Sequence, residues 1–153
     1  MAPGIWWFSS MACVALALVP AGAHLAELPR KFRLPAREYL VVQQLYSGWS
    51  LFGVVVSGAL LSTSVLTVLV RRQPRLLAAA VLTFLCILCT QIVFWVFAQP
   101  ANRATHNWTV LPGNWMLLRR QWEYSHAASA VLNLIALFAL LHAAVSQRAG
   151  LLH

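Results

Sequence analysis

The stretch Leu76–Ala98, LLAAAVLTFLCILCTQIVFWVFA, decides the fold of this chain. It contains no charged residue, and a helix that crosses a bilayer needs about 20 consecutive apolar residues. We therefore expect residues 76–98 to span a membrane. Three further apolar runs predict helices at about 5–23, 39–70 and 115–146. The sequence thus predicts an all-α fold, a bundle of four transmembrane helices.

The composition agrees with a membrane environment. Hydrophobic residues make up 61% of the chain and charged residues only 9%, whereas soluble domains have about 25% charged residues. The net charge of +8 would suit nucleic acid, but the basic residues occur in short runs beside apolar segments. This placement favours lipid head groups over nucleic acid as the partner. With short linkers between the spans, residues 1–153 are expected to form a single integral membrane domain.

The first apolar run, Ile5–Ala23, has two interpretations. Its small residues Ala21–Ala23 would suit cleavage by a signal peptidase. A signal peptide also requires a basic segment before its apolar run, and no Lys or Arg precedes Ile5. We therefore expect a retained helix. The following stretch, His24–Glu38, is rich in proline and basic residues and predicts an interfacial loop, and Pro100 is expected to end the third helix.

Polar residues gather at one end of the predicted bundle. If successive helices alternate in direction, the loops 24–38 and 99–114 lie on the same side of the membrane. All three carboxylates of the chain, Glu27, Glu38 and Glu123, then lie on that side. Ionisable groups at membrane depth are costly to place there and indicate functional sites. This end is therefore the predicted location of the chain's chemistry.

Two of these carboxylates are paired with a histidine three residues away. His24 and Glu27 form H-L-A-E, and Glu123 and His126 form E-Y-S-H. Residues three apart share a helix face, and helical bundles use such pairs to hold a metal ion. The two pairs predict a shared site in which all four residues are metal ligands. Axial ligation of a haem iron by the two histidines is an alternative, and a site without a cofactor is another.

A purely structural interpretation stands beside this one. Glu123 then pairs with Arg119 or Arg120 at the membrane surface, and His126 donates a hydrogen bond to a neighbouring helix. Adjacent helical residues point about 100° apart, so only one of the two arginines can face the bundle interior. We expect the two arginines to differ in their roles.

Aromatic and amide side chains accompany the predicted site. Trp108, Trp115 and Trp122 lie in or after the loop 99–114, where tryptophans commonly form an interfacial belt. At this place they can also wall a pocket for a flat apolar molecule. Gln43 lies on a face of the second helix where small and polar residues recur at helical spacing. These four residues are the predicted substrate-binding residues.

A family resemblance covers mainly the C-terminal half. The residues that carry it are Pro100-Ala101-Asn102, Trp108, Pro112, Trp115, Arg119-Arg120, Trp122 and His126. In them the chain resembles the anthrone oxygenase-like family of small four-helix membrane proteins. H-L-A-E-L-P and V-Q-Q-L-Y-S-G-W are similar to features of a bacterial branch, which implies a bacterial inner membrane. In the fungal members the activity is oxygenation of a polycyclic anthrone to an anthraquinone; the family often has an arginine after the histidine position, where this chain has Ala127–Ala130.

Two functions from different classes follow. The first is a membrane oxidoreductase or oxygenase that acts on an aromatic or quinone-like lipophile entering from the bilayer. A histidine would act as the base, a glutamate would orient it, and two further groups would stabilise an oxyanion. The predicted catalytic residues are His126, Glu123, His24, Arg120 and Asn102. The second function is that of a non-enzymatic accessory or assembly subunit in an oligomer or larger membrane complex, with the polar end as its docking surface.

Overall fold

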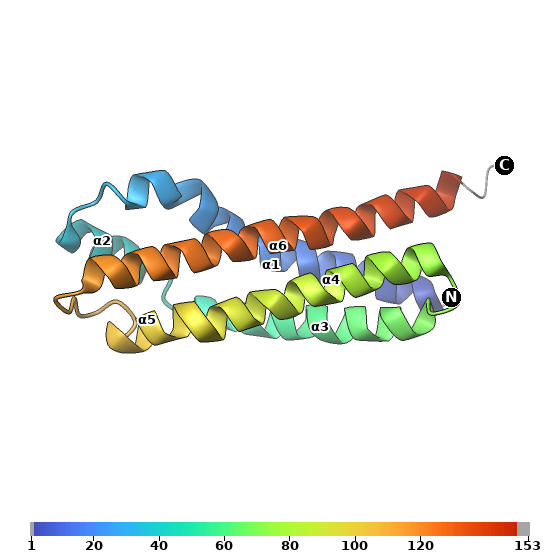
Figure 1. The fold of residues 1–153 in the computed structure, drawn as a ribbon, viewed down its shortest axis with the longest axis horizontal. Coiled ribbons are helices and arrows are strands. Elements are labelled where there is room, and N and C mark those ends of the chain that lie inside the picture. Colours follow the sequence, from blue (N-terminus) through green and yellow to red (C-terminus); the bar gives the residue numbers. More distant parts are fainter. Residues whose placement is uncertain (1, 150–153) are drawn as a thin grey trace.

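The computed structural model describes residues 2–149 and is an elongated bundle of helices (Figure 1). Four long elements form its body: α1 (Ala2–Lys31), α3 (Phe52–Leu69), α4 (Pro74–Val93) and α6 (Trp115–Ala149). The short helices α2 (Ala36–Gln44) and α5 (Gln99–Ala104) lie together at one end. The all-α four-helix bundle expected from the sequence is confirmed.

The four long helical segments are suited to a bilayer. Gly4–Lys31, Trp49–Leu69, Pro74–Ala104 and Trp115–Gln147 are each long and apolar enough to cross a membrane. Large hydrophobic side chains such as those of Phe8, Val54, Ile92 and Phe138 point outward and are more than half exposed. Apolar surface of this extent is stable only against lipid or protein. The chain is therefore an integral membrane protein whose helices contact lipid.

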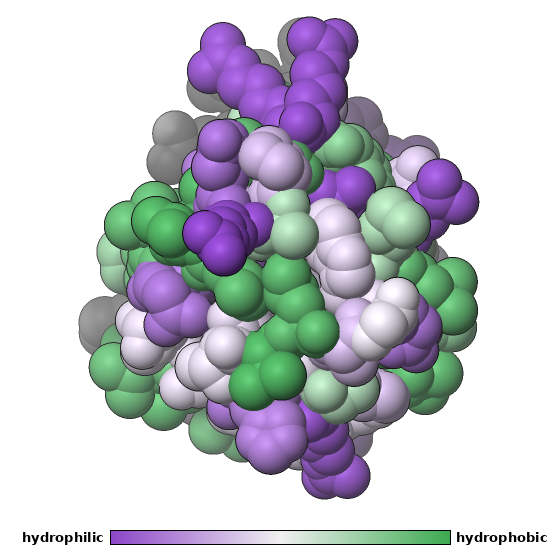
Figure 2. Space-filling view, turned by 90° about the vertical axis from the view of Figure 1, so that its left-hand side faces the viewer, coloured by the Kyte–Doolittle hydropathy of each residue, from purple (hydrophilic) through white to green (hydrophobic). Residues whose placement is uncertain are grey.

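The end that carries α2 and α5 has a different surface. Figure 2 views this end along the bundle and shows hydrophilic side chains interspersed with hydrophobic ones. Exposed arginines of this end are Arg30, Arg33, Arg37, Arg103 and Arg120. Such a mixture suits the boundary between hydrocarbon and lipid head groups, where long basic side chains reach the aqueous phase.

The first helix is longer than the sequence predicted. The stretch His24–Glu38 was expected to be a loop, but α1 continues through His24 and Pro29 as far as Lys31. Pro29 cannot donate the helical hydrogen bond to Leu25, but α1 nevertheless continues for two residues beyond it. The actual turn is formed by Phe32–Pro35. This extension carries three polar side chains of α1 into the bundle end.

The second and third predicted helices also differ from expectation. The run 39–70 is not continuous: α2 ends at Gln44, and a turn with Gly48 at φ +85° leads into a 3-10 turn (η1, Trp49–Leu51) before α3. Glycine adopts this left-handed conformation without a steric penalty. Conversely, Pro100 does not end the third helix, because α4 passes through a π-helical turn (η2, Phe94–Ala98) into α5, where Pro100 sits in the first turn.

The bundle is closed by packing of α3 against α1 and α4, and of α6 against α1 and α4. Close approach of α1 and α3 depends on Gly58. A β-carbon added there would lie 3.3 Å from the sulfur of Cys13. In membranes, small residues at helix interfaces allow this approach and the van der Waals contacts that stabilise it.

We predict that Gly58→Leu lowers the free energy of unfolding by about 1–3 kcal/mol, because the added side chain overpacks the interface between α1 and α3. Gly53→Leu is the matched control on the same helix, since no atom lies within 4 Å of a β-carbon added there. Unfolding of the detergent-solubilised variants by a denaturing detergent measures both effects. Equal stability of the two variants would contradict the packing role of Gly58.

Candidate functional site

The candidate site is centred on the amino group of Lys31, the last residue of α1. The Lys31 side chain is only 2% exposed. Its Nζ atom lies 2.8 Å from Nδ1 of His24, 3.1 Å from Oε2 of Glu27 and 3.6 Å from Oε2 of Glu123. An ammonium group has only donors, so His24 accepts at Nδ1 and in its neutral form carries its proton on Nε2. Lys31 thus links α1 to α6 through a buried ion pair.

Glu123 is fully buried and is held from two directions. Its Oε1 atom accepts a hydrogen bond from the hydroxyl of Tyr39 at 3.0 Å and a long one from Nε2 of Gln43 at 3.5 Å. Its Oε2 atom faces Lys31 and accepts no hydrogen bond from the described residues. A buried carboxylate of this kind is stable only because a cation and hydrogen-bond donors surround it.

Helical spacing explains why these side chains meet. His24, Glu27 and Lys31 follow one another at intervals of three and four residues, so they lie on one face of α1. Glu123 and His126 share a face of α6 in the same way. The two helices pack on each other, and this packing brings both faces together. The two His/Glu pairs expected to converge at one bundle end therefore do lie together there.

Aromatic rings enclose the polar groups. The ring of His24 lies 4.5 Å from that of His126, 4.8 Å from that of Trp122 and 4.4 Å from that of Tyr46, measured between centroids. The Lys31 amino group lies 4.3 Å from the centroid of Tyr46. Cation–π attraction adds to the ion pairs at this distance. His126 is partly exposed, and none of the described residues forms a hydrogen bond with its ring.

Arg119 lies beside the site and contacts the end of α1. It is 9% exposed, and its guanidinium donates to the carbonyl oxygens of Leu34 at 3.0 Å, Lys31 at 3.3 Å and Phe32 at 3.4 Å. Lys31 is the last residue of α1, and Phe32 and Leu34 lie in the turn after it, so Arg119 provides donors to carbonyls where the helix ends. The guanidinium also lies 4.7 Å from the centroid of Trp115.

The loop after α5 is fixed by a hydrogen bond to Asn102 and contains a strained stretch of backbone. Oδ1 of Asn102 accepts a hydrogen bond from Nε1 of Trp108 at 3.2 Å. His106, Asn107 and Trp108 all have positive φ angles, between 49° and 61°. Three successive non-glycine residues in this region are unfavourable by about 1–2 kcal/mol each. Burial of the Trp108 ring, 5.2 Å from Tyr39 and 5.9 Å from Trp122, offsets part of this strain.

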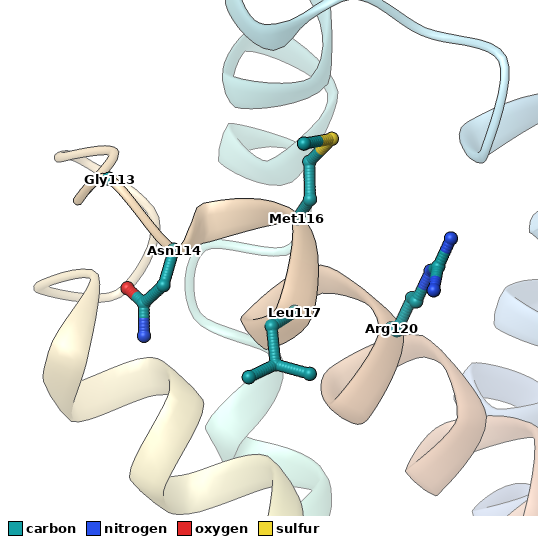
Figure 3. Close-up of a pocket in the computed structure, with 5 residues that line it drawn as sticks. All are labelled: Gly113, Asn114, Met116, Leu117 and Arg120. Atoms are coloured by element: carbon teal, nitrogen blue, oxygen red, sulfur yellow. The ribbon is translucent and has the colours of Figure 1, made fainter.

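The remaining predicted site residues fall into two groups. Gln43, Trp108 and Trp122 are buried in or beside the cluster around Lys31. Arg120, in contrast, is exposed, and its side chain projects from α6 beside a surface pocket (Figure 3). The expected difference between the two arginines is thus seen in their placement, with Arg119 as the inward one. Asn102 contacts Trp108 and lies outside the group that contacts Lys31.

The geometry bears on the cofactors considered above. Among residues 2–149, no three His, Cys, Asp or Glu side chains are arranged to hold a metal ion. The position between His24, Glu27 and Glu123 that a shared metal would take is occupied by the amino group of Lys31. The rings of His24 and His126 are in direct contact, which leaves no space for a haem between them. The residues therefore do not fit a shared metal ion, whose place Lys31 takes, and they do not fit a haem between the two histidines.

Sequence reasoning missed Lys31, Tyr39 and Tyr46. The signal for Lys31 was present, since it lies four residues after Glu27 and seven after His24 on the same helical face. Because Pro29 and Pro35 indicated a loop, this helical spacing of Lys31 was not considered. Tyr39 and Tyr46 become visible as site residues only once α2 and the turn after it fold over the end of the bundle.

Burial raises the pKa of both tyrosines well above its ordinary value of 10.0. For Tyr39 the carboxylate of Glu123 adds to the effect of burial, by its charge and by accepting the hydrogen bond. For Tyr46 the hydrogen bond that its hydroxyl donates to Glu27 adds to the effect of burial. Both phenols therefore remain protonated donors throughout the neutral and mildly alkaline range.

Comparison of the chain with models of known protein families, with curated proteins and with solved structures gives no significant match.

We predict that Glu123→Gln lowers the free energy of unfolding by about 3–5 kcal/mol, because it leaves the amino group of Lys31 buried without its second carboxylate. Glu27→Gln is the matched control, since Glu27 also contacts Lys31 but its side chain is 46% exposed. Denaturant unfolding in detergent measures both, and the control should lose about 1 kcal/mol or less. A similar loss in both variants would show that burial of Glu123 is not the deciding factor.

We predict that stability falls above pH 10 because of Tyr39 and Tyr46. Their raised pKa means that the unfolded phenols ionise first, so stabilisation that is complete below pH 10 declines as the pH rises toward the folded-state pKa. The double variant Tyr39→Phe, Tyr46→Phe should therefore show a shallower decline between pH 9 and pH 12 (about three pH units) than the parent protein. Unfolding curves at a series of pH values provide the measurement, and parallel declines would rule out this origin.

Proposed function

We propose that this protein is a membrane oxidoreductase of the oxygenase type that removes a proton from an aromatic or quinone-like lipophile. The observation that supports it best is the combination of a buried ammonium group, Lys31, and a partly exposed imidazole, His126, within a cluster of aromatic rings. Proton abstraction from carbon or phenolic oxygen requires a base and a group that stabilises the resulting anion. Both are present within one side of the bundle end.

His126 is the proposed base. Its ring is 4.3 Å from Trp122 and 4.5 Å from His24, between centroids, and it forms no hydrogen bond with the described residues. A neutral imidazole with a free nitrogen can accept a proton from a bound molecule. His24 is less suitable because its Nδ1 atom already accepts from Lys31. It instead presents an N–H group at Nε2, which suits a donor to substrate.

Lys31 is the proposed anion-stabilising group, in place of the role first expected for Arg120 and Asn102. Glu27 and Glu123 hold the ammonium in position from two sides. The contact with Glu123 is too long for a hydrogen bond, and Glu27, which also accepts a hydrogen bond from Tyr46, is 46% exposed. A substrate oxygen can therefore approach Lys31 and take over one of its donors. The low dielectric of the site strengthens this interaction.

The partly exposed flank of the cluster is the proposed entrance. It is formed by Glu27, Tyr46, Trp49 and His126. The rings of Tyr46 and Trp49 lie 4.9 Å apart in an edge-to-face arrangement. A flat apolar molecule entering from the bilayer would stack against these rings.

The overall reaction balances with dioxygen as the co-reactant. A ring methylene loses one proton to His126, and its electron pair remains as an enolate that forms a carbon–oxygen bond with dioxygen. The same carbon then loses its second proton as the O–O bond breaks, so that one oxygen atom becomes a new carbonyl at that carbon and the other leaves with the two protons as water. The resemblance to the anthrone oxygenase-like family supports this class of substrate. It also supports the bacterial inner membrane as the location of the protein.

We predict that the purified protein consumes dioxygen in the presence of anthrone and forms anthraquinone. His126→Ala should lower kcat by about 10²–10⁴-fold through loss of the base, and Lys31→Met by about 10²–10³-fold through loss of anion stabilisation. Arg30→Gln is the matched control, since Arg30 precedes Lys31 but is exposed, and it should retain full activity. An oxygen electrode and anthraquinone absorbance provide the measurements. Equal turnover in all three variants would reject the proposed roles.

The same variants separate the enzyme from an accessory subunit. An accessory subunit would show no turnover in any form, while cross-linking in native membranes would capture a constant partner that is retained by the His126→Ala variant. An enzyme gives the opposite result, with turnover that depends on His126.

A further inference from the structure

A groove on the lipid-facing side of the bundle carries a second proposal, which does not depend on the proposed activity. It runs between α6 and the π-helical turn η2 and has a volume of about 430 Å³. Its apolar wall includes Val93, Phe97, Leu117 and Ala128, and Arg120 also lines it. A smaller depression at the start of α6, shown in Figure 3, shares Leu117 and Arg120 with the groove. The groove and this depression adjoin at these two residues, and we call them together the recess.

The π-helical turn lines this recess and is linked to α6 by a specific contact. A π turn inserts an extra residue into an α-helix and changes the pairing of its carbonyl groups, and such turns are frequent at functional sites. Here the side chain of Gln121 on α6 donates a hydrogen bond to the carbonyl oxygen of Phe97 at 2.8 Å. This contact satisfies the backbone of η2 and fixes its distance from α6. The recess is therefore a fixed feature of the bundle end.

Arg120 gives the recess a positive charge without a counter-charge from the protein. It is exposed, and within residues 2–149 it forms no ion pair and no hydrogen bond. The first turn of α6 contains no acidic residue, so the positive end of the helix dipole is also uncompensated there. The charge complementarity therefore favours an anion beside Arg120, with an apolar chain below it.

We propose that the recess binds one anionic phospholipid, with its phosphate on Arg120 and an acyl chain along the groove. From Arg120 to Ala128 the axis of α6 rises by about 12 Å, which fits within one leaflet of a hydrocarbon core about 30 Å thick. An arginine binds phosphate through two parallel hydrogen bonds. A zwitterionic head group satisfies Arg120 less well because it carries its own cation. The bound lipid covers the surface of α6 opposite to the site around Lys31.

Native mass spectrometry of the full-length protein with phosphatidylglycerol tests this proposal. Arg120→Gln should raise the dissociation constant for phosphatidylglycerol by about tenfold through loss of the charge-assisted contact. Arg37→Gln is the matched control, since Arg37 is also exposed at this end but lies on α2, and it should bind as the parent does. Ala128→Phe should reduce binding similarly by filling the groove while Arg120 remains.

Three outcomes would overturn the proposal. One is equal binding of phosphatidylglycerol by the Arg120→Gln and Arg37→Gln variants. Another is binding of phosphatidylcholine as strong as that of phosphatidylglycerol. The third is competition by inorganic phosphate at concentrations that remove the lipid from the parent protein, which would indicate a free-anion site without a chain in the groove.

Discussion

The buried contact between Lys31 and Glu123 is the constraint on which the end of the bundle depends. Both side chains are almost completely removed from solvent, and neither would be stable there alone. The pair determines how α1 and α6 approach each other, and the other polar residues arrange themselves around it. Tyr39 and Gln43 satisfy one oxygen of Glu123, so the pair also determines where α2 lies. The position of α2 and the charge balance of the site therefore both depend on Glu123.

Hydropathy was sufficient to predict the four spans, because long apolar runs have few alternatives in a membrane protein. It failed where local signals competed. Pro29 suggested a loop, but one proline removes only one helical hydrogen bond, and α1 continues to Lys31. A single glycine, Gly48, within an apolar run did not indicate a break in the helix, but its left-handed backbone separates α2 from α3. The spacing of His24, Glu27, Glu123 and His126 predicted their convergence, but not that a lysine would take the place of a metal ion.

Two adjacent arginines illustrate how a helix divides neighbouring side chains between environments. Arg119 faces inward, donates to carbonyls at the end of α1 and in the turn after it, and lies over Trp115. Arg120 is exposed on the outer surface of the bundle. The sequence alone predicted that they would differ, since neighbours on a helix point about 100° apart. It could not predict which one faces inward, because that depends on the rotation of α6, and this rotation is determined by burial of Glu123 and Trp122.

The ion pair also has a consequence for biogenesis. Lys31 ends the first span and Glu123 lies in the fourth, so the two charges enter the membrane at opposite ends of synthesis. Until α6 is inserted, Lys31 has only Glu27 and the membrane surface to compensate it, and its position at the end of α1 makes this waiting state tolerable. A nascent chain that stops before α6 therefore has an incomplete polar centre. Quality-control machinery could recognise such an intermediate by its unpaired ammonium group, whereas the finished bundle hides it.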